Sequence, residues 1–442
     1  MLKVLANRTY RRLFAAQIIA LSATGLLTVA LGLLAFRLAG EDAGKVLGTA
    51  LAIKMIAYVG VAPIVGSFAN RLPRRAFLVT MDLVRAAVAL FLPFIDQIWQ
   101  IYTLIFLLQS ASAAFTPTFQ ATIPDVIPDE RDYTRALSLS RLAYDMESLL
   151  SPMLAAALLT VVGFHWLFAG TVVGFIASAL LVFSVTLPQP TVSDRSGGVY
   201  DRTTRGIRIY LATPRLRGLL ALNLSVAAAG AMVIVNTVVL VRGTLLLSDT
   251  HVGVALASFG GGSMIAALAL PSLLERANDR RVMLPAAGLL AILLFILAAV
   301  LSMNVAPPWP AVLLTWALLG IGYSAVQTPT GRLLRRSSQP SDRPALFAAQ
   351  FALSHACWLI TYPLAGWLGA AAGMPAVLIV LGLITAFGVA MAALLWPVID
   401  PETVFHEHPD LSSDHPHLDD GARRHKHAFV IDDLHPRWPK AV

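Results

Sequence analysis

Histidine is concentrated at the carboxyl-terminal end of this chain. Of its ten histidines, seven lie within the last 37 residues, and six of these form three His-x-His pairs. The seven are His406, His408, His415, His417, His425, His427 and His435. Because imidazole is the commonest side-chain ligand of divalent transition metals, this tail predicts metal binding.

Carboxylates are interleaved with these histidines. They belong to Asp410, Asp414, Asp419, Asp420, Asp432 and Asp433. Nitrogen and oxygen donors at irregular spacing favour a loose segment that binds several ions over a rigid site. A second interpretation stays open, in which the tail is a disordered polar terminus and its histidines are incidental.

The chain ahead of the tail is strongly apolar. A mean hydropathy of +0.72 with only 13% charged residues excludes an ordinary soluble protein, in which about a quarter of the residues are charged. Because unpaired backbone groups are costly in hydrocarbon, apolar stretches of about 20 residues must be helices. The prediction is an all-α integral membrane protein with twelve transmembrane helices. They cover residues 13–38, 46–68, 77–95, 101–121, 137–161, 166–187, 216–241, 252–274, 282–303, 309–331, 346–368 and 375–397.

Basic residues sort by side of the membrane. With the amino terminus inside, 27 of the 33 Lys and Arg fall in cytoplasmic segments, while Arg37, Lys45 and Arg242 lie near the outer face. Both termini, and with them the tail, are therefore predicted in the cytoplasm. The net charge of +8 then needs no nucleic-acid partner. A single cysteine, Cys357, excludes a disulfide framework and a thiolate-rich metal cluster.

The chain divides into two pseudo-symmetric six-helix halves. Residues 1–187 form the first half, 188–215 a cytoplasmic linker, 216–397 the second half and 398–442 a disordered His- and Asp-rich tail. Thr116-Pro117-Thr118 recurs as Thr328-Pro329-Thr330, and Pro152 aligns with Pro363. Repeated halves are typical of secondary transporters, whose substrate sites lie near the bilayer midplane between the repeats.

The loop after the second predicted helix contains Gly66, Arg71, Arg74 and Arg75 in a characteristic order. It resembles the loop motif of the major facilitator superfamily, and this similarity implies the twelve-helix transporter fold and a gating role for the loop. Asp82 and Arg85 of the next helix are grouped with this predicted gating loop. Asn70 stands where the family usually has Asp, and it cannot carry that residue's charge.

Two further segments narrow the resemblance. Phe115-Thr116-Pro117 and the run 123–130 resemble the exporter branch that includes siderophore and macrolide efflux proteins. Ser354-His355-Ala356-Cys357-Trp358 and residues 427–436 of the tail resemble nickel-resistance exporters of the NreB type. This second similarity implies nickel, and after it cobalt, as the transported ion.

Ionisable residues inside the predicted helices mark candidate transport residues, because charge is costly in hydrocarbon. Asp82 with Arg85 and Arg141 with Asp145 are spaced to pair on one helix face. The first pair is interpreted as a brace for the basic loop. The second is left open between a structural pair and a site for proton coupling.

Glu147 lies close to the bilayer midplane, about 15 Å into its helix at about 1.5 Å per residue. It either pairs structurally with Lys54 or exchanges protons for substrate. His355 is predicted at similar depth and opposite Tyr144, where it could share an ion with a carboxylate. It could equally be a hydrogen-bonded packing residue, and Cys357 is read as a small hydrophobe.

The chain is thus predicted to be an exporter and not an enzyme, since no Walker-type loop is present and Gly260-Gly261-Gly262 lies inside a helix. The first hypothesis is proton-coupled export of Ni²⁺ or Co²⁺ by a monomer in a bacterial inner membrane. Its partners are the metal substrate and the lipid bilayer, and no cofactor is bound permanently. The alternatives are efflux of an organic molecule, such as a drug or siderophore, and a membrane-anchored metal buffer or sensor.

Overall fold

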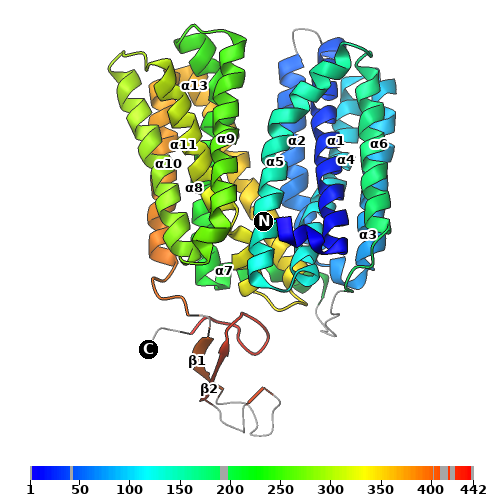
Figure 1. The fold of residues 1–442 in the computed structure, drawn as a ribbon, viewed down its shortest axis with the longest axis vertical. Helices are drawn as coiled ribbons and strands as arrows, with labels where there is room; N and C mark the ends of the chain where they lie inside the picture. Colours follow the sequence, from blue (N-terminus) through cyan, green and yellow to red (C-terminus); the bar gives the residue numbers. More distant parts are fainter. Residues whose placement is uncertain are drawn as a thin grey trace.

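Two bundles of long helices stand side by side in the computed structural model, which describes residues 2–39, 43–189, 198–401, 403–408, 417–418 and 424–439 (Figure 1). The first bundle contains α1 (Arg8–Ala39), α2 (Ala43–Gly66), α3 (Arg74–Phe91), α4 (Ile98–Val126), α5 (Glu130–Leu159) and α6 (His165–Phe183). Three short 3-10 helices accompany it: η1 (Leu2–Ala6), η3 (Ala69–Arg71) and η4 (Leu92–Phe94).

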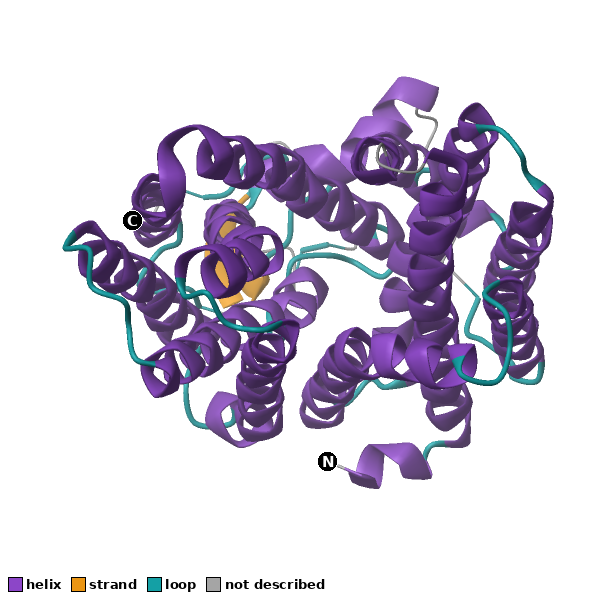
Figure 2. Cartoon of the chain, turned by 90° about the horizontal axis from the view of Figure 1, so that it is seen from above, coloured by secondary structure: helices purple, strands orange, loops and turns teal. Residues whose placement is uncertain are grey.

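The second bundle follows helix α7 (Val199–Ala212), which connects the two. It contains α8 (Pro214–Val238) with its π-helical extension η5 (Val239–Thr244), α9 (Asp249–Leu274), α10 (Asp279–Ser302), α11 (Trp309–Gln327), α12 (Thr330–Arg336) and α13 (Arg343–Leu395). Seen from above, the helices again form two groups (Figure 2). The prediction of an all-helical membrane fold is confirmed.

Eleven helical spans in the described part of the chain are long and apolar enough to cross a membrane. Helix α5, parts of which lie outside the described residues, is not one of them. The count of twelve spans therefore stays a prediction.

A single glycine interrupts the longest helix. Helix α13 has non-helical backbone at Gly373, whose φ of 80° lies in the left-handed region that residues with a Cβ rarely adopt. Gly373 falls between the two predicted helices 346–368 and 375–397, so α13 contains both of these predicted helices.

Small residues let helices of the second bundle approach closely. A Cβ added to Gly262 of α9 would lie 1.9 Å from the carbonyl oxygen of Ala317 on α11. A Cβ added to Gly320 of α11 would lie 1.9 Å from the carbonyl oxygen of Phe259 on α9. The expectation that the glycine run serves helix packing is confirmed at Gly262. Helix α8 occupies the core of this bundle, where Thr237 accepts a 2.9 Å hydrogen bond from the fully buried Trp316.

The tail carries a small antiparallel sheet of β1 (Thr403–Glu407) and β2 (Arg424–Ala428). The sequence predicts a disordered tail, so the structure differs here. Residues of β1 are alternately exposed and partly buried. After β2, Phe429 and Ile431 are buried against the second bundle. The face that carries α7 and this sheet is called the tail side (Figure 1).

Candidate functional site

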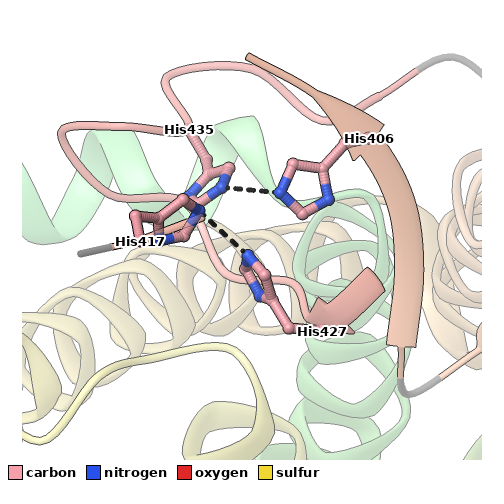
Figure 3. Close-up of side chains that lie close together, drawn as sticks. All are labelled: His406, His417, His427 and His435. Atoms are coloured by element: carbon pink, nitrogen blue, oxygen red, sulfur yellow. Dashed lines mark hydrogen bonds between the residues drawn. The ribbon is translucent and has the colours of Figure 1, made fainter. Parts of the chain in front are cut away.

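The strand pairing gathers the tail histidines. His406 lies opposite His425 in the sheet, and His427 lies opposite Val404. Because side chains two residues apart share one face of a strand, His425 and His427 of β2 present both imidazoles on the same side, and His408 follows His406 directly after the end of β1. His417 approaches that face from the connection between the two strands, and His435 approaches it from the segment after β2 (Figure 3).

The imidazole Nε2 atoms converge on one point. The distance between the Nε2 atoms of His406 and His435 is 3.0 Å, and that between His408 and His417 is 3.1 Å. Three further pairs are separated by 3.2 Å: His408 with His435, His417 with His425, and His417 with His427. These six residues form the tail cluster. His415, the seventh predicted ligand, lies outside the described residues.

Hydrogen bonds at the opposite ring nitrogens orient three of these imidazoles. The Nδ1 of His435 donates to Asp432 at 2.7 Å, that of His406 to the Val404 carbonyl at 3.0 Å, and that of His427 to the Ala428 carbonyl at 2.8 Å. A proton held on Nδ1 leaves a lone pair on Nε2, which is the usual arrangement of histidines that ligate metals.

Three imidazoles of the tail cluster favour the neutral form. Burial, together with the neighbouring imidazoles, lowers the pKa of His406 and of His417 from 6.5 to about 4, and lowers the pKa of His408. Burial alone would raise the pKa of Asp432, but the hydrogen bond from His435 lowers it below its usual range. At neutral pH these three rings therefore offer uncharged nitrogen donors, and the Asp432 carboxylate is ionised.

Polar contacts attach the tail cluster to the second bundle. Asp432 accepts a 2.6 Å hydrogen bond from Gln339, and Asp433 pairs with Arg205 of α7 at 2.9 Å. The same Arg205 pairs at 2.6 Å with Asp342, just before α13. The cluster is thus tied to the loop between α12 and α13.

In the membrane region, α5 and α9 meet through a charged pair. Arg141 pairs with Asp145, as the spacing predicted, and Asp145 also accepts a 2.6 Å hydrogen bond from Ser263 of α9. The guanidinium of Arg141 lies 4.9 Å from the ring centroid of Tyr323 on α11. Asp145 is only 2% exposed, so this pair is a buried connection between the two bundles.

Glu147 lies on another part of α5 and is partly buried. Its Oε1 is directed at α1, where a Cβ on Gly25 would come within 3.2 Å of it. The charge of Lys54 acts on Glu147 electrostatically, but no salt bridge joins these two described side chains. Direct pairing of Glu147 with Lys54 is therefore not found.

His355 packs between the bundles against aromatic rings. Its ring centroid lies 4.7 Å from that of Tyr58 on α2 and 4.2 Å from that of Phe351. Its Nδ1 donates to the Phe351 carbonyl at 2.7 Å, which leaves the Nε2 lone pair available. Lys54 lies over the same Tyr58 ring at 5.5 Å, and the Tyr58 hydroxyl donates to Gln109 at 2.9 Å.

The predicted midplane ligand set is therefore not assembled in this conformation. Asp145 is engaged by Arg141 and Ser263, Glu147 faces α1, and His355 packs against Tyr58. Within the described residues, groups of three or more potential metal ligands occur only in the tail. The pattern of helical depth could not show that these side chains leave α5 and α13 in different directions.

The predicted gating loop contacts the second bundle. Arg74 pairs with Asp125 at 2.6 Å, and Asp125 also pairs with Arg343 at the start of α13. A Cβ on Gly66 would come within 2.5 Å of Ala348, so the loop lies directly against α13. The guanidinium of Arg75 lies over the Phe183 ring, whereas Arg71 is exposed and the Asn70 side chain lies outside the described residues.

The predicted pair of Asp82 and Arg85 is present and buried in the first bundle. Asp82 also accepts a 2.8 Å hydrogen bond from Ser178 of α6. Arg85 lies between the rings of Phe115 and Phe175, at 4.2 and 4.6 Å from their centroids. These contacts join α3, α4 and α6.

Sequence reasoning missed a group of ion pairs at the ends of α5, α10 and α12. Arg332 of α12 pairs with Glu130 of α5 at 2.9 Å and with Asp279 of α10 at 3.2 Å. Arg336 pairs with the same Asp279 at 3.2 Å. The available signal was the opposite charge of these helix ends. The pair of Arg332 with Glu130 joins the bundles at this end, as does that of Arg343 with Asp125 at the start of α13.

Two bundles of apolar helices that meet through buried charge are typical of membrane transporters. The chain belongs to the Major Facilitator Superfamily, whose family model matches residues 13–244 and 219–410. As members of this family are transporters, the prediction that the protein is not an enzyme is confirmed.

Individual relatives are distant. The chain is 24% identical over 189 residues to macrolide efflux protein A of Enterococcus faecalis, and 25% identical over 185 residues to that of Streptococcus pyogenes. Each match covers 40% of this chain. The matched part is 58% of the length of the Enterococcus protein and 45% of the length of the Streptococcus protein.

Among solved structures, a bacterial homologue of the iron transporter ferroportin, in an outward-facing state, has a similar fold. The TM-score is 0.74 at 14% identity, over 88% of this chain and 99% of that one. A likeness at this identity establishes the fold alone.

Proposed function

We propose that this transporter exports divalent metal cations, Ni²⁺ first and Co²⁺ second, in exchange for protons by alternating access. The observation that carries the proposal is the tail cluster, in which six imidazoles converge beside the transporter bundles. Nitrogen donors without thiolates suit Ni²⁺ and Co²⁺. The resemblance of residues 354–358 and of the tail to NreB-type nickel-resistance exporters supports the same substrate.

The proposed path crosses the interface between the bundles. Glu147 exchanges protons, with Lys54 as the nearby cation that the proton or metal displaces. His355 serves as a transient ligand through its Nε2, and the pair of Arg141 and Asp145 opens and closes the contact between α5 and α9. The metal ion is a substrate here. The protein acts as a monomer in a bacterial inner membrane with both termini in the cytoplasm.

Metal tolerance tests the proposal. Deleting the gene should make the bacterium sensitive to nickel and cobalt, and the wild-type gene should restore tolerance. A Glu147→Gln variant that is made at normal level should fail to restore it, because the amide cannot exchange a proton. Unchanged nickel and cobalt sensitivity together with raised drug sensitivity would contradict the proposal.

A second candidate is efflux of an organic molecule, favoured by the similarity to macrolide efflux proteins. Aromatic rings between the bundles, those of Tyr58, Phe351 and Tyr323, could contact an apolar cargo. A third candidate is a membrane-anchored metal buffer without transport. Since Glu147→Gln leaves the tail intact, loss of tolerance in that variant excludes the buffer.

A further inference from the structure

The six imidazoles of the tail cluster are arranged as the corners of an octahedron. Twelve of the ring pairs have centroids 4.5 to 5.4 Å apart. The pair of His406 and His417 is longer, at 6.2 Å. An octahedron has twelve edges and three diagonals, and His406 with His417 is one diagonal.

The other two diagonals are the pairs of histidines of the tail cluster whose rings are not in contact. His408 with His427, and His425 with His435, are the two pairs that form no ring contact in the described part of the tail. Each of the six rings then has four neighbours and one opposite ring. No two ligands compete for the same corner.

The nitrogen distances have the scale of a metal coordination sphere. Five edges between Nε2 atoms measure 3.0 to 3.2 Å. In a regular octahedron this edge places each nitrogen about 2.1–2.3 Å from the centre, close to the metal–imidazole bond length of about 2.0–2.1 Å. A tetrahedron with the same edge would need bonds of about 1.8–2.0 Å, at or below that length, so the choice between the two rests on the number of rings and on the four neighbours that each ring has.

The converging lone pairs require a cation. His406 and His435 both hold their Nδ1 hydrogen atoms in bonds to oxygen, so their facing Nε2 atoms carry lone pairs 3.0 Å apart. Without a positive charge between them these atoms repel each other. A single proton could bridge one such pair as a hydrogen bond, but each of the six rings has four neighbours, and this is the arrangement of ligands around one metal ion.

We propose that the tail cluster is a six-coordinate site that retains one Ni²⁺ or Co²⁺ ion and thereby fixes the tail to the second bundle. The six imidazoles provide all six ligands and leave no open position. Closed coordination is typical of structural metal sites, whereas sites that exchange ligands keep a position open. The ion is therefore a resident of the tail and not one in transit to the membrane.

A chain of hydrogen bonds and ion pairs connects the metal site to the contact between the bundles. Asp432 orients His435 and also binds Gln339, and the adjacent Asp433 binds Arg205. Arg205 binds Asp342, next to Arg343, which pairs with Asp125 of the first bundle. The bound ion is thus placed to stabilise the contact between the bundles at this end.

Cobalt binding to the full-length protein in detergent tests this proposal, and its result does not depend on transport. Six-coordinate Co²⁺ absorbs weakly in the visible range because its d–d transitions are nearly forbidden, whereas four-coordinate Co²⁺ absorbs strongly. We expect one tightly bound Co²⁺ per chain with a weak spectrum, displaced stoichiometrically by Ni²⁺. A strong four-coordinate spectrum, or several loosely bound ions, would overturn the proposal.

Two variants make the test specific. His417→Ala removes a ligand with four neighbouring rings and should weaken binding more than about 100-fold, since loss of an outer partner alone costs about 10–100-fold. Lys426→Ala lies between His425 and His427, is exposed, and should bind as the wild type does. Metal should also protect the tail from limited proteolysis in the wild type and in Lys426→Ala. Equal binding by both variants would refute the six-ligand site.

Discussion

Replacing Asp145 by Asn tests whether the pair of Arg141 and Asp145, which lies on α5 where it meets α9, is shielded from water. The substitution leaves the Arg141 guanidinium in place without its carboxylate, and breaking a buried pair in this way costs about 3–5 kcal/mol. The Tyr323 ring at 4.9 Å retains a cation–π attraction of about 1–2 kcal/mol. The net loss expected is therefore near the lower limit, about 3 kcal/mol.

A second pair on the same helix provides the control. Asp132 and Arg135 are also spaced for pairing, with an N–O distance of 2.8 Å, but their side chains are 33% and 28% exposed. Exposed pairs contribute at most about 1 kcal/mol, so Asp132→Asn should change stability by less than that. Replacing both members of the buried pair, as Arg141→Met with Asp145→Leu, should recover most of the stability lost in Asp145→Asn.

Reversible unfolding of the purified variants in detergent mixtures measures these differences. The order expected is Asp145→Asn least stable, then the double variant, with Asp132→Asn close to the wild type. If Asp145→Asn and Asp132→Asn lose the same amount, the pair is not desolvated between the bundles, and the reasoning is refuted.

Three further predictions concern the tail. Asp432→Asn should weaken metal binding about 10–100-fold in a chelator competition, because His435 loses the carboxylate that orients it; unchanged affinity would contradict that role. The metal-free tail should lose stability as the pH falls from 6.5 towards 4, because His406 and His417 bind protons at 6.5 when unfolded but only near 4 when folded. Proteolysis at pH 7.5 and pH 5 would show this as faster tail cleavage at pH 5, and an equal rate would count against it. Removing the residues after Pro401 should reduce metal tolerance only partly, and complete loss would mean that the tail is required for transport.

The membrane fold was predictable because hydrocarbon leaves the backbone few choices. An apolar stretch of about 20 residues without a closed sheet must be helical, so the helices could be placed from hydropathy alone. Charge spacing along one helix also predicted the pairs of Asp82 with Arg85 and of Arg141 with Asp145, both of which are present.

Contacts between distant segments could not be obtained in this way. The tail cluster depends on the pairing of Thr403–Glu407 with Arg424–Ala428, which sets His406 opposite His425. Composition identified the ligands but gave no strand register, so it predicted a loose segment. The pairs of Arg343 with Asp125 and of Arg332 with Glu130 likewise depend on which helix ends meet when the bundles assemble.

Nickel flux in reconstituted vesicles tests metal export most directly. Protein inserted in liposomes, with Ni²⁺ on the side of the tail and a higher proton concentration on the opposite side, should move nickel across the membrane and move protons the other way. The Glu147→Gln variant should bind nickel at the tail as the wild type does but transport none. Wild-type protein that binds nickel yet shows no proton-driven flux would contradict the account.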